Sequence, residues 1–221
     1  MTEIEVVLTF ATSLNIGSGA QEGTLADRAF IKARDGWPYV PATAFKGQLR
    51  HAVERVASGM GFEVCDTHRK MCRPDKPVCP VCQIFGSPWI PGRLRFVDLE
   101  LASPALLMKK REQDRRSRIH PRYSSRYGVA LNRRRGVAAD ALLYTTELFE
   151  PGVPVSFKGV LTGEIGLVST AWVVAGLNFL TAMGRAKSAG LGWVEAKAVV
   201  QIDGCVVDDE ELRVALLEVA R

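Results

Sequence analysis

The chain has 221 residues, of which 47% are hydrophobic, 24% charged and 8% aromatic. A chain of this length and composition can bury a sizeable core, which excludes intrinsic disorder, collagen and a disulfide-stapled miniprotein as descriptions of the whole. The opening residues Met1–Glu5 carry acidic side chains where a signal peptide would carry lysine or arginine. We therefore expect a protein that is not secreted and that resides in the cytoplasm.

The net charge of +5 is concentrated in one segment. Between Lys109 and Arg135 there are eleven basic and two acidic residues, interleaved with His120, Tyr123 and Tyr127. Cations suit phosphates, and flat rings suit unpaired bases. The segment predicts a nucleic-acid-binding arm, either a protruding hairpin or a loop ordered by its ligand, and the alternative is a solvated charged loop.

In chain order, the first predicted element is a strand. Residues 3–12 alternate between apolar and polar side chains, which places Ile4, Val6, Leu8 and Phe10 on one face. Two short extended pieces follow at 30–32 and 37–41, separated by a turn at 34–36.

A first core helix is predicted from Thr43, as its N-cap, to Gly59, because apolar residues recur at helical spacing. Lys46 and Arg50 lie four residues apart near its amino end. The helix dipole and the free amides there favour an anion such as phosphate. Ordinary surface charge is the alternative.

Four of the five cysteines, Cys65, Cys72, Cys79 and Cys82, fall within one short stretch that also contains His68. Disulfides are not expected without an export signal, whereas a C-x2-C knuckle with further Cys and His residues is typical of tetrahedral zinc. We prefer Cys65 to His68 as the fourth ligand, and free thiols are the alternative. A full ligand set predicts a structural site, where metal replaces an apolar core in this polar segment.

The remaining pattern alternates strands and helices. Strands are predicted at 94–101, 142–147, 153–161 and 192–202, and a short helix at 210–219. The uncharged run 165–184 predicts a buried helix begun by Ser169 rather than a membrane span. This order indicates an α+β sandwich with helices on one face of an antiparallel sheet.

A glycine-rich loop, GRAKSAGLG, runs from Gly184 to Gly192 and contains Arg185 and Lys187. It matches neither of the common nucleotide-binding glycine patterns. Such a loop can bring backbone amides close to a phosphate, although the needs of a turn alone would also explain the glycines.

The order of these motifs is more specific than any one of them. The motifs are Ile16-Gly17-Ser18-Gly19, residues 27–32, residues 35–41 (DGWPYVP), residues 45–50 (FKGQLR), residues 79–87 (CPVCQIFGS) and GRAKSAGLGWV. Together they resemble the RAMP superfamily, in particular the repeating backbone subunit of type III CRISPR effector complexes. The resemblance covers nearly the whole chain.

The resemblance implies a single domain over residues 1–221, with a ferredoxin-like (RRM-like) palm. It also implies a zinc-binding insertion at about 60–92 and a basic thumb hairpin at about 104–136. Copies of the chain would stack with other effector subunits along a guide (CRISPR) RNA, and each thumb would displace a nucleotide of the guide–target duplex.

The chemistry implied by the resemblance is cleavage of the paired target RNA, with Asp27 as the essential acidic group and Mg²⁺ or Mn²⁺ as the cofactor. His120 and Arg133 are possible helpers. The expected RNA-binding residues are Lys46, Arg50, Arg122, Arg126, Arg133, Arg185, Lys187 and Ser188. In the alternative, Asp27 caps a turn and the chain is an inactive RNA-binding scaffold. A stand-alone guide-processing nuclease ranks below both, because it would rely on histidine chemistry and the chain has three histidines.

Overall fold

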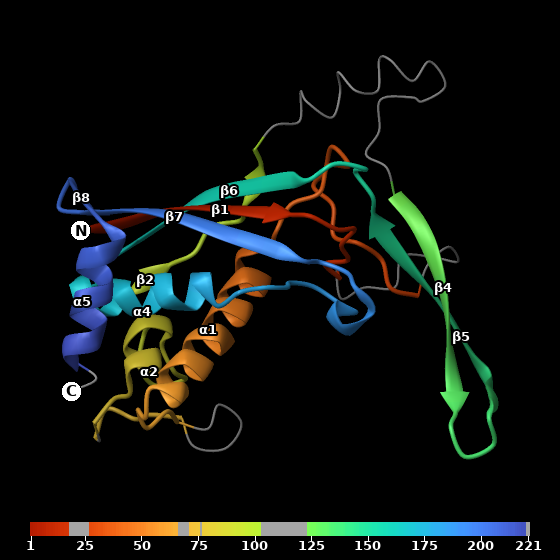
Figure 1. Ribbon diagram of the computed structural model, residues 1–221, viewed down its shortest axis with the longest axis horizontal. Coiled ribbons are helices and arrows are strands. Elements are labelled where there is room, and N and C mark those ends of the chain that lie inside the picture. Colours follow the sequence, from red (N-terminus) through yellow and green to blue (C-terminus); the bar gives the residue numbers. More distant parts are fainter. Residues whose placement is uncertain (18–26, 66–70, 76, 103–122, 220–221) are drawn as a thin grey trace.

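The computed structural model describes residues 1–17, 27–65, 71–75, 77–102 and 123–219 (Figure 1). The elements are β1 (Thr2–Phe10), α1 (Ala42–Gly59), α2 (Pro80–Phe85), β2 (Leu94–Arg95), β3 (Glu100–Leu101), β4 (Tyr123–Asn132), β5 (Val137–Phe149), β6 (Val155–Gly163), α4 (Leu167–Asn178), the 3-10 helix η1 (Lys187–Ala189), β7 (Val194–Ile202), β8 (Cys205–Val207) and α5 (Asp209–Val219). They form a sheet covered by helices, which we call the palm, and a long hairpin beside it.

The palm sheet has the strand order β2-β6-β1-β7-β8, and β3 also pairs with β6. β1 runs antiparallel to β6 and to β7, and β2 runs antiparallel to β6. The connection through α1 therefore joins the parallel strands β1 and β2 with β6 between them, and α4 joins β6 to β7 across β1. Two interlocked split β-α-β units make a ferredoxin-like arrangement. The predicted α+β ferredoxin-like palm is confirmed.

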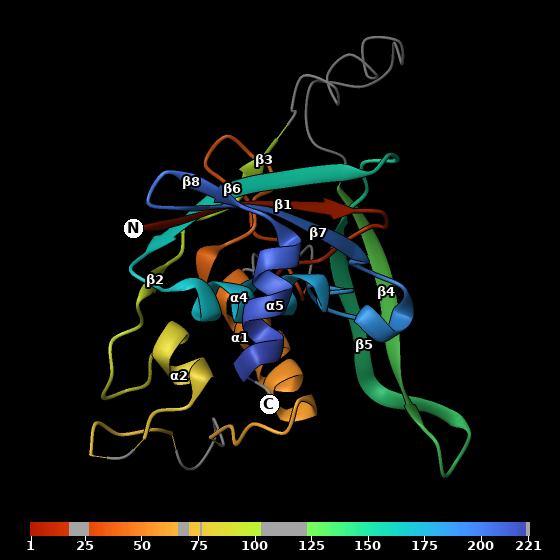
Figure 2. The same cartoon turned by 60° about the vertical axis from the view of Figure 1, so that its left-hand side comes forward.

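The helices cover one face of this sheet (Figures 1 and 2). The predicted alternation in β1 is confirmed, because Ile4, Val6 and Leu8 are fully buried and Phe10 is 1% exposed. These side chains share one apolar cluster with α1 and with Trp172 of α4. Within the part of the chain that the structure describes, no helix is long and apolar enough to cross a membrane.

The starts predicted for the first two helices are wrong by a short distance. α1 begins at Ala42, and Thr43 lies inside the first turn instead of capping it. The backbone N of Ala42 donates instead to Asp98 Oδ1 at 2.7 Å, so a carboxylate from a distant segment takes the place of a local cap. α4 begins at Leu167, ahead of Ser169.

The strand predicted at 94–101 is also wrong as one continuous element. β2 and β3 both pair with β6, but the chain leaves the sheet between them. Leu99 exchanges two backbone hydrogen bonds of 2.9 and 3.0 Å with Val40, which holds this stretch against the segment that precedes α1. Phe96, in the same interval, stacks on Phe85 of α2 with ring centroids 5.8 Å apart. Tertiary contacts therefore interrupt the alternating pattern.

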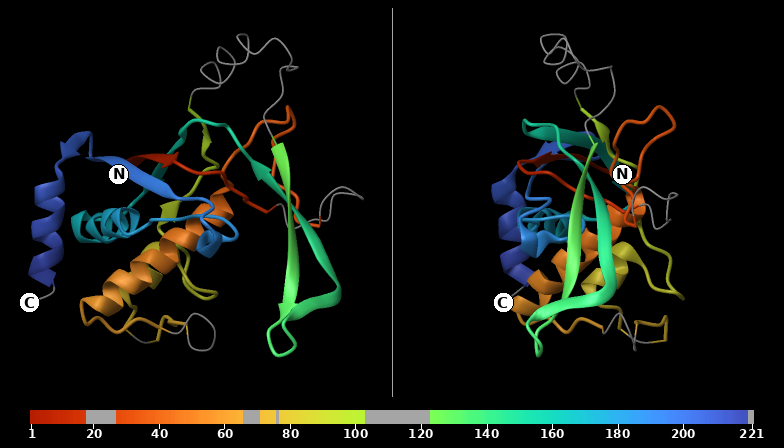
Figure 3. Two further views of the ribbon diagram at one scale, coloured as in Figure 1. Left: turned by 45° about the vertical axis from the view of Figure 1, so that its right-hand side comes forward. Right: turned by 90° about the vertical axis from the view of Figure 1, so that its right-hand side faces the viewer.

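The hairpin of β4 and β5 projects from the palm (Figure 3). The ladder runs from Tyr123 opposite Phe149 to Asn132 opposite Val137, and its register shifts between Val129 and Leu131, near the end of β4. Where the hairpin meets the palm, the Phe30 ring lies 5.6 Å from Tyr123 and 6.2 Å from Phe149 between centroids. β4 lies within the basic segment 109–135, and β5 follows that segment. Residues 109–122 of the basic segment lie outside the described residues.

Candidate functional site

Asp27 lies where the hairpin meets the palm, in a cluster of backbone contacts that we call the hairpin root (residues 27–30 and 145–147). The backbone N of Thr145 donates to Asp27 Oδ2 at 2.7 Å. Arg28 N donates to Thr145 O, and Glu147 N donates to Arg28 O, both at 3.1 Å. Asp27 is exposed. The contacts fix a carboxylate at the surface, beside the first exposed part of the hairpin.

Glu147 holds the same place from the hairpin side. Its Oε1 accepts from Lys32 Nζ at 2.6 Å and its Oε2 accepts from Phe30 N at 3.0 Å. Burial, with the negative charge of Glu147 nearby, raises the pKa of Tyr123, whose hydroxyl donates to Gly36 O at 3.0 Å. Both carboxylate oxygens of Glu147 are therefore engaged within the protein, and this residue has a structural role at the root.

Asn15 connects the hairpin root to the glycine-rich loop. Its side chain is fully buried, and Nδ2 donates to Glu147 O at 2.5 Å and to Arg28 O at 3.4 Å. Its backbone O accepts from Arg185 N at 2.8 Å. One buried asparagine thus contacts the segment of Asp27, strand β5 and the basic loop.

The loop between α4 and β7 carries Arg185, Lys187 and Ser188, all exposed. Gly192 has φ +69°, and a Cβ there would come within 1.9 Å of Met183 O, so close backbone packing requires this glycine. Lys187 Nζ donates to Gln48 Oε1 of α1 at 3.1 Å. The requirement at Gly192 is structural, whereas the cations face solvent where an anionic ligand can reach them.

The other predicted RNA-binding residues are dispersed over the molecule. Arg126 is exposed on β4, and Arg133 opens the exposed turn at the tip of the hairpin. Lys46 lines an open groove of about 1040 Å³ together with Arg93 and Arg95. The predictions for His68, His120 and Arg122 fall on residues outside those that the structure describes.

Arg50 faces the interior, away from the other predicted RNA ligands. Its guanidinium is bonded to Glu54 on its own helix, to the backbone O of Gly86 and to the sulfur of Cys82. Its side chain is only 16% exposed. The structure therefore brings Arg50 to the cysteines and does not bring it to the hairpin root.

Sequence reasoning missed several residues in the hairpin root and next to it. The Arg28 guanidinium lies 4.0 Å from the centre of the Tyr144 ring, a cation–π contact at the surface next to Asp27. Tyr144 stands opposite Gly128 in the ladder and covers it, so that a Cβ there would meet the ring at 2.4 Å. For Asn15, the signal was a lone polar residue between two apolar ones, Leu14 and Ile16.

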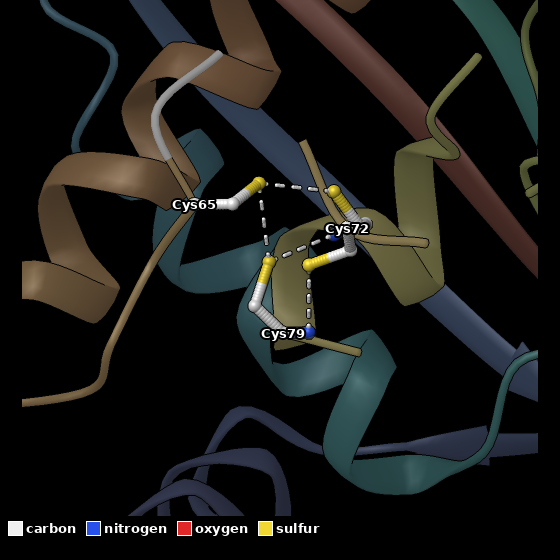
Figure 4. A group of neighbouring side chains, drawn as sticks. Cys65, Cys72 and Cys79 are labelled. Atoms are coloured by element: carbon white, nitrogen blue, oxygen red, sulfur yellow. Dashed lines mark hydrogen bonds between the residues drawn. The ribbon is translucent and has the colours of Figure 1, made fainter. Parts of the chain in front are cut away.

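The four clustered cysteines converge between the end of α1 and α2. The sulfurs of Cys65, Cys72, Cys79 and Cys82 lie within 4.8 Å of one another, and Figure 4 shows three of them pointing toward one another. The sulfur of Cys65 is 3.3 Å from that of Cys82 and 3.8 Å from that of Cys79. Sulfurs bound to one tetrahedral zinc ion, with bonds of about 2.3 Å, are separated by similar distances.

The local backbone also suits a metal knuckle. Cys82 N donates to Cys79 Sγ at 3.5 Å, and Cys79 N donates to Cys72 Sγ at 3.4 Å. Burial raises the pKa of the Cys65 and Cys82 thiols, so a cation must displace their protons to be bound. The donor set fits zinc, and Cys65 lies in the cluster as a fourth sulfur, while His68 lies outside the described residues.

One expectation for this segment needs correction. Metal was expected to replace an apolar core, yet α2 contributes Val81, Ile84 and Phe85 to the main core of the palm. Val81 and Ile84 are fully buried, and Phe85 is 2% exposed. The insertion is therefore anchored by apolar packing as well as by its cysteines.

Comparison with known proteins agrees with this structure. No curated protein matches the chain. The family model described as the RAMP superfamily matches residues 7–195, which include the palm from within β1 to the start of β7, the cysteine cluster, the hairpin and the glycine-rich loop. The chain belongs to the RAMP superfamily, the RNA-binding proteins of CRISPR systems.

Proposed function

We propose that this protein is a backbone subunit of a type III CRISPR effector that binds guide RNA and cleaves the paired target RNA. The observation that carries the proposal is the exposed Asp27 carboxylate, fixed by Thr145 N at the root of a hairpin whose tip bears arginines. Further copies of the chain and other effector subunits would complete the complex. Guide and target RNA would meet it in the cytoplasm.

The hairpin supports this proposal through its shape and charge. Its tip presents Arg133, Arg134 and Arg135 in succession, and Asn132 Oδ1 accepts from the backbone N of Arg134 and of Arg135 at 3.2 Å. Arginine contacts to phosphate fix position without reading sequence. Lys46, Arg126, Arg185, Lys187 and Ser188 supply further exposed or groove-lining contacts, and base pairing with the guide would select the target.

The proposed chemistry uses one carboxylate and a distorted RNA strand. Thr145 N engages Oδ2 of Asp27 and leaves the carboxylate able to accept a proton from a 2′-hydroxyl. The 2′-oxygen then attacks the adjacent phosphorus and the bond to the 5′-oxygen breaks, with solvent protonating the leaving oxygen. A strand bent by the hairpin can hold these atoms in line, which accounts for much of such a barrier.

Asp27 also has the chemistry to hold a divalent cation. Mg²⁺ prefers carboxylate oxygens together with water and phosphate oxygens, and a single exposed carboxylate suits that shell. When bound, Mg²⁺ or Mn²⁺ would neutralise the charge that develops on the phosphate. Glu147 does not fit as a second ligand, because Lys32 and Phe30 N engage both of its oxygens.

A second function, an inactive RNA-binding scaffold, is favoured by the same hydrogen bond. In this second function, the carboxylate accepts a hydrogen bond from Thr145 N and its whole role is to attach the hairpin to the palm. In that case Asp27 would matter for the shape of the complex and not for chemistry.

The two functions are separated by Asp27→Asn, which keeps an acceptor for Thr145 N but removes the charge. Asp98→Asn is the matched control, because Asp98 is also exposed and also accepts a backbone N at 2.7 Å. The assembled complex is incubated with Mg²⁺ or Mn²⁺ and a labelled RNA that matches the guide, and cleavage and binding are measured.

We expect regularly spaced cuts from the wild type and from Asp98→Asn. Asp27→Asn should bind the RNA equally well but cut it at least about 100-fold more slowly. Cleavage by Asp27→Asn at the wild-type rate would assign Asp27 to structure alone. A wild type that binds and never cuts would make the chain a scaffold.

A further inference from the structure

Arg50 of α1 makes an unusual set of contacts for a surface-helix arginine. Nε donates to Glu54 Oε1 at 3.0 Å, Nη1 donates to Gly86 O at 2.8 Å, and Nη2 donates to Cys82 Sγ at 3.5 Å. The Arg50 and Glu54 side chains are each only 16% exposed. One guanidinium thus joins α1 to the sulfur of Cys82, inside α2, and to the carbonyl of Gly86, which caps the carboxyl end of α2.

The negative charge of a metal-loaded cysteine site would be stabilised by these contacts of Arg50. Four thiolates around one Zn²⁺ carry a net charge of about −2, and Cys82 is fully buried. A buried negative charge is stabilised by a nearby cation and by hydrogen bonds to the charged atom. Of the cations whose contacts the structure describes, Arg50 is the one whose guanidinium reaches a sulfur of the cluster.

The geometry also restricts what can replace arginine. Gly86 has φ +85°, and a Cβ there would meet Gly92 N at 2.6 Å, so the turn after α2 has little freedom. Its carbonyl is held against Nη1 while Glu54 fixes Nε. A planar fork reaches all three partners at once, whereas the ammonium of lysine is a single point.

We propose that Arg50 is a positioning residue of the zinc site, which compensates thiolate charge and transmits metal loading to α1. The residue was expected to bind RNA, and its contacts give it this different partner. α1 also carries Gln48, which accepts a hydrogen bond from Lys187 of the glycine-rich loop. Metal loading would therefore stabilise α1 and, through Gln48, the position of that loop. The proposal concerns a different site from Asp27, and none of its tests uses RNA.

Zinc affinity of the full-length protein is measured by competition with a chromophoric chelator. Arg50→Gln should bind zinc about 10- to 100-fold more weakly than the wild type. Arg55→Gln is the matched control, since Arg55 is on the same helix but is exposed and lies over Phe179, 4.8 Å from its ring centre. It should leave the affinity unchanged, and Arg50→Lys should restore only part of it.

Cobalt substitution reports on the sulfur itself. Loss of the Nη2 donor leaves the Cys82 thiolate less stabilised, so the sulfur-to-Co²⁺ charge-transfer band of Arg50→Gln should move to lower energy. If Arg50→Gln does not fold, Glu54→Gln keeps the cation and an acceptor for Nε but removes the carboxylate charge that holds the guanidinium in place. This variant should weaken zinc binding by less than about 10-fold, with a smaller shift of the band.

Hydrogen exchange tests the transmission to α1. Removing zinc from the wild type should speed exchange of the amides around Arg50, and in Arg50→Gln the loaded and zinc-free forms should exchange alike in this region. Wild-type zinc affinity together with an unmoved cobalt band in Arg50→Gln, or in Glu54→Gln where that variant is used, would overturn the proposal and leave Arg50 as an ordinary packing residue.

Discussion

Replacing Asn15 with alanine tests how the segments of the hairpin root are held together. Asn15 is fully buried, and its Nδ2 donates to Glu147 O at 2.5 Å and to Arg28 O at 3.4 Å. Arg28 O keeps a second donor in the variant, Glu147 N at 3.1 Å, but Glu147 O loses the buried side-chain donor. An unsatisfied buried carbonyl costs about 1–3 kcal/mol.

Asn15 Oδ1 is buried without a hydrogen-bond partner among the described residues, so its removal offsets part of this cost. With a small cavity added, we therefore expect Asn15→Ala to lower the free energy of unfolding by about 1–3 kcal/mol. Urea unfolding measures the loss, and hydrogen exchange should locate it at Thr145–Glu147. Asn132→Ala is the control, because Asn132 is exposed at the hairpin tip and water replaces its contacts. Its cost should stay below about 1 kcal/mol. An equal, small loss in both variants would refute the role given to Asn15.

Three further predictions concern other parts of the molecule. Gly192→Ala should destabilise strongly, because its Cβ would meet Met183 O at 1.9 Å, whereas Gly47→Ala, which has open space in α1, should stabilise by up to about 1 kcal/mol in the same urea assay. Chelating zinc should lower the Tm of the wild type by more than about 5 °C in calorimetry, and it should leave the Tm of Cys79→Ser unchanged. Replacing the three tip arginines Arg133–Arg135 with alanine should make guide-RNA binding less sensitive to salt. Each lost phosphate contact lowers the slope of log K against log salt concentration by about 0.7, so the slope should fall by about 2 when binding is measured by fluorescence anisotropy. The first prediction is contradicted if Gly192→Ala is as stable as Gly47→Ala. The second is contradicted if chelation leaves the wild-type Tm unchanged, and the third if the triple-alanine variant keeps the wild-type salt slope.

Local pattern predicted the main elements of the palm because burial leaves a pattern in the sequence. In β1 and α1 one face meets the core, and the spacing of their apolar residues displays that face directly. α4 is buried on nearly all sides, from Thr170 to Val174 without a break, and the uncharged run that contains it displays this instead. The cysteine cluster was predictable for a similar reason, since a metal knuckle needs its donors close together along the chain. All four cysteines fall between residues 65 and 82, and the structure brings their sulfurs together.

Features set by contacts between distant segments were not predictable in this way. The cap of α1 comes from Asp98, and the break between β2 and β3 comes from pairing of Leu99 with Val40. In each pair the two residues lie in different segments, so the local sequence around one of them does not indicate the other. The same holds for Arg50, whose spacing from Lys46 indicates a surface anion site while its guanidinium turns to Gly86 and Cys82.

The hairpin root combines both situations, and this explains why Asp27 could be named while its surroundings could not. Its bond to Thr145 spans 118 positions, and the bond from Asn15 to Glu147 spans 132. In each bond one partner is a backbone group, which nearly every residue carries, so the sequence gives no sign of where the partner of the Asp27 or Asn15 side chain lies. A resemblance can indicate which carboxylate to examine, but only the folded chain shows that this exposed carboxylate also accepts a hydrogen bond from the hairpin. Removing the charge and keeping the acceptor, as Asp27→Asn does, is therefore the substitution that separates the two roles.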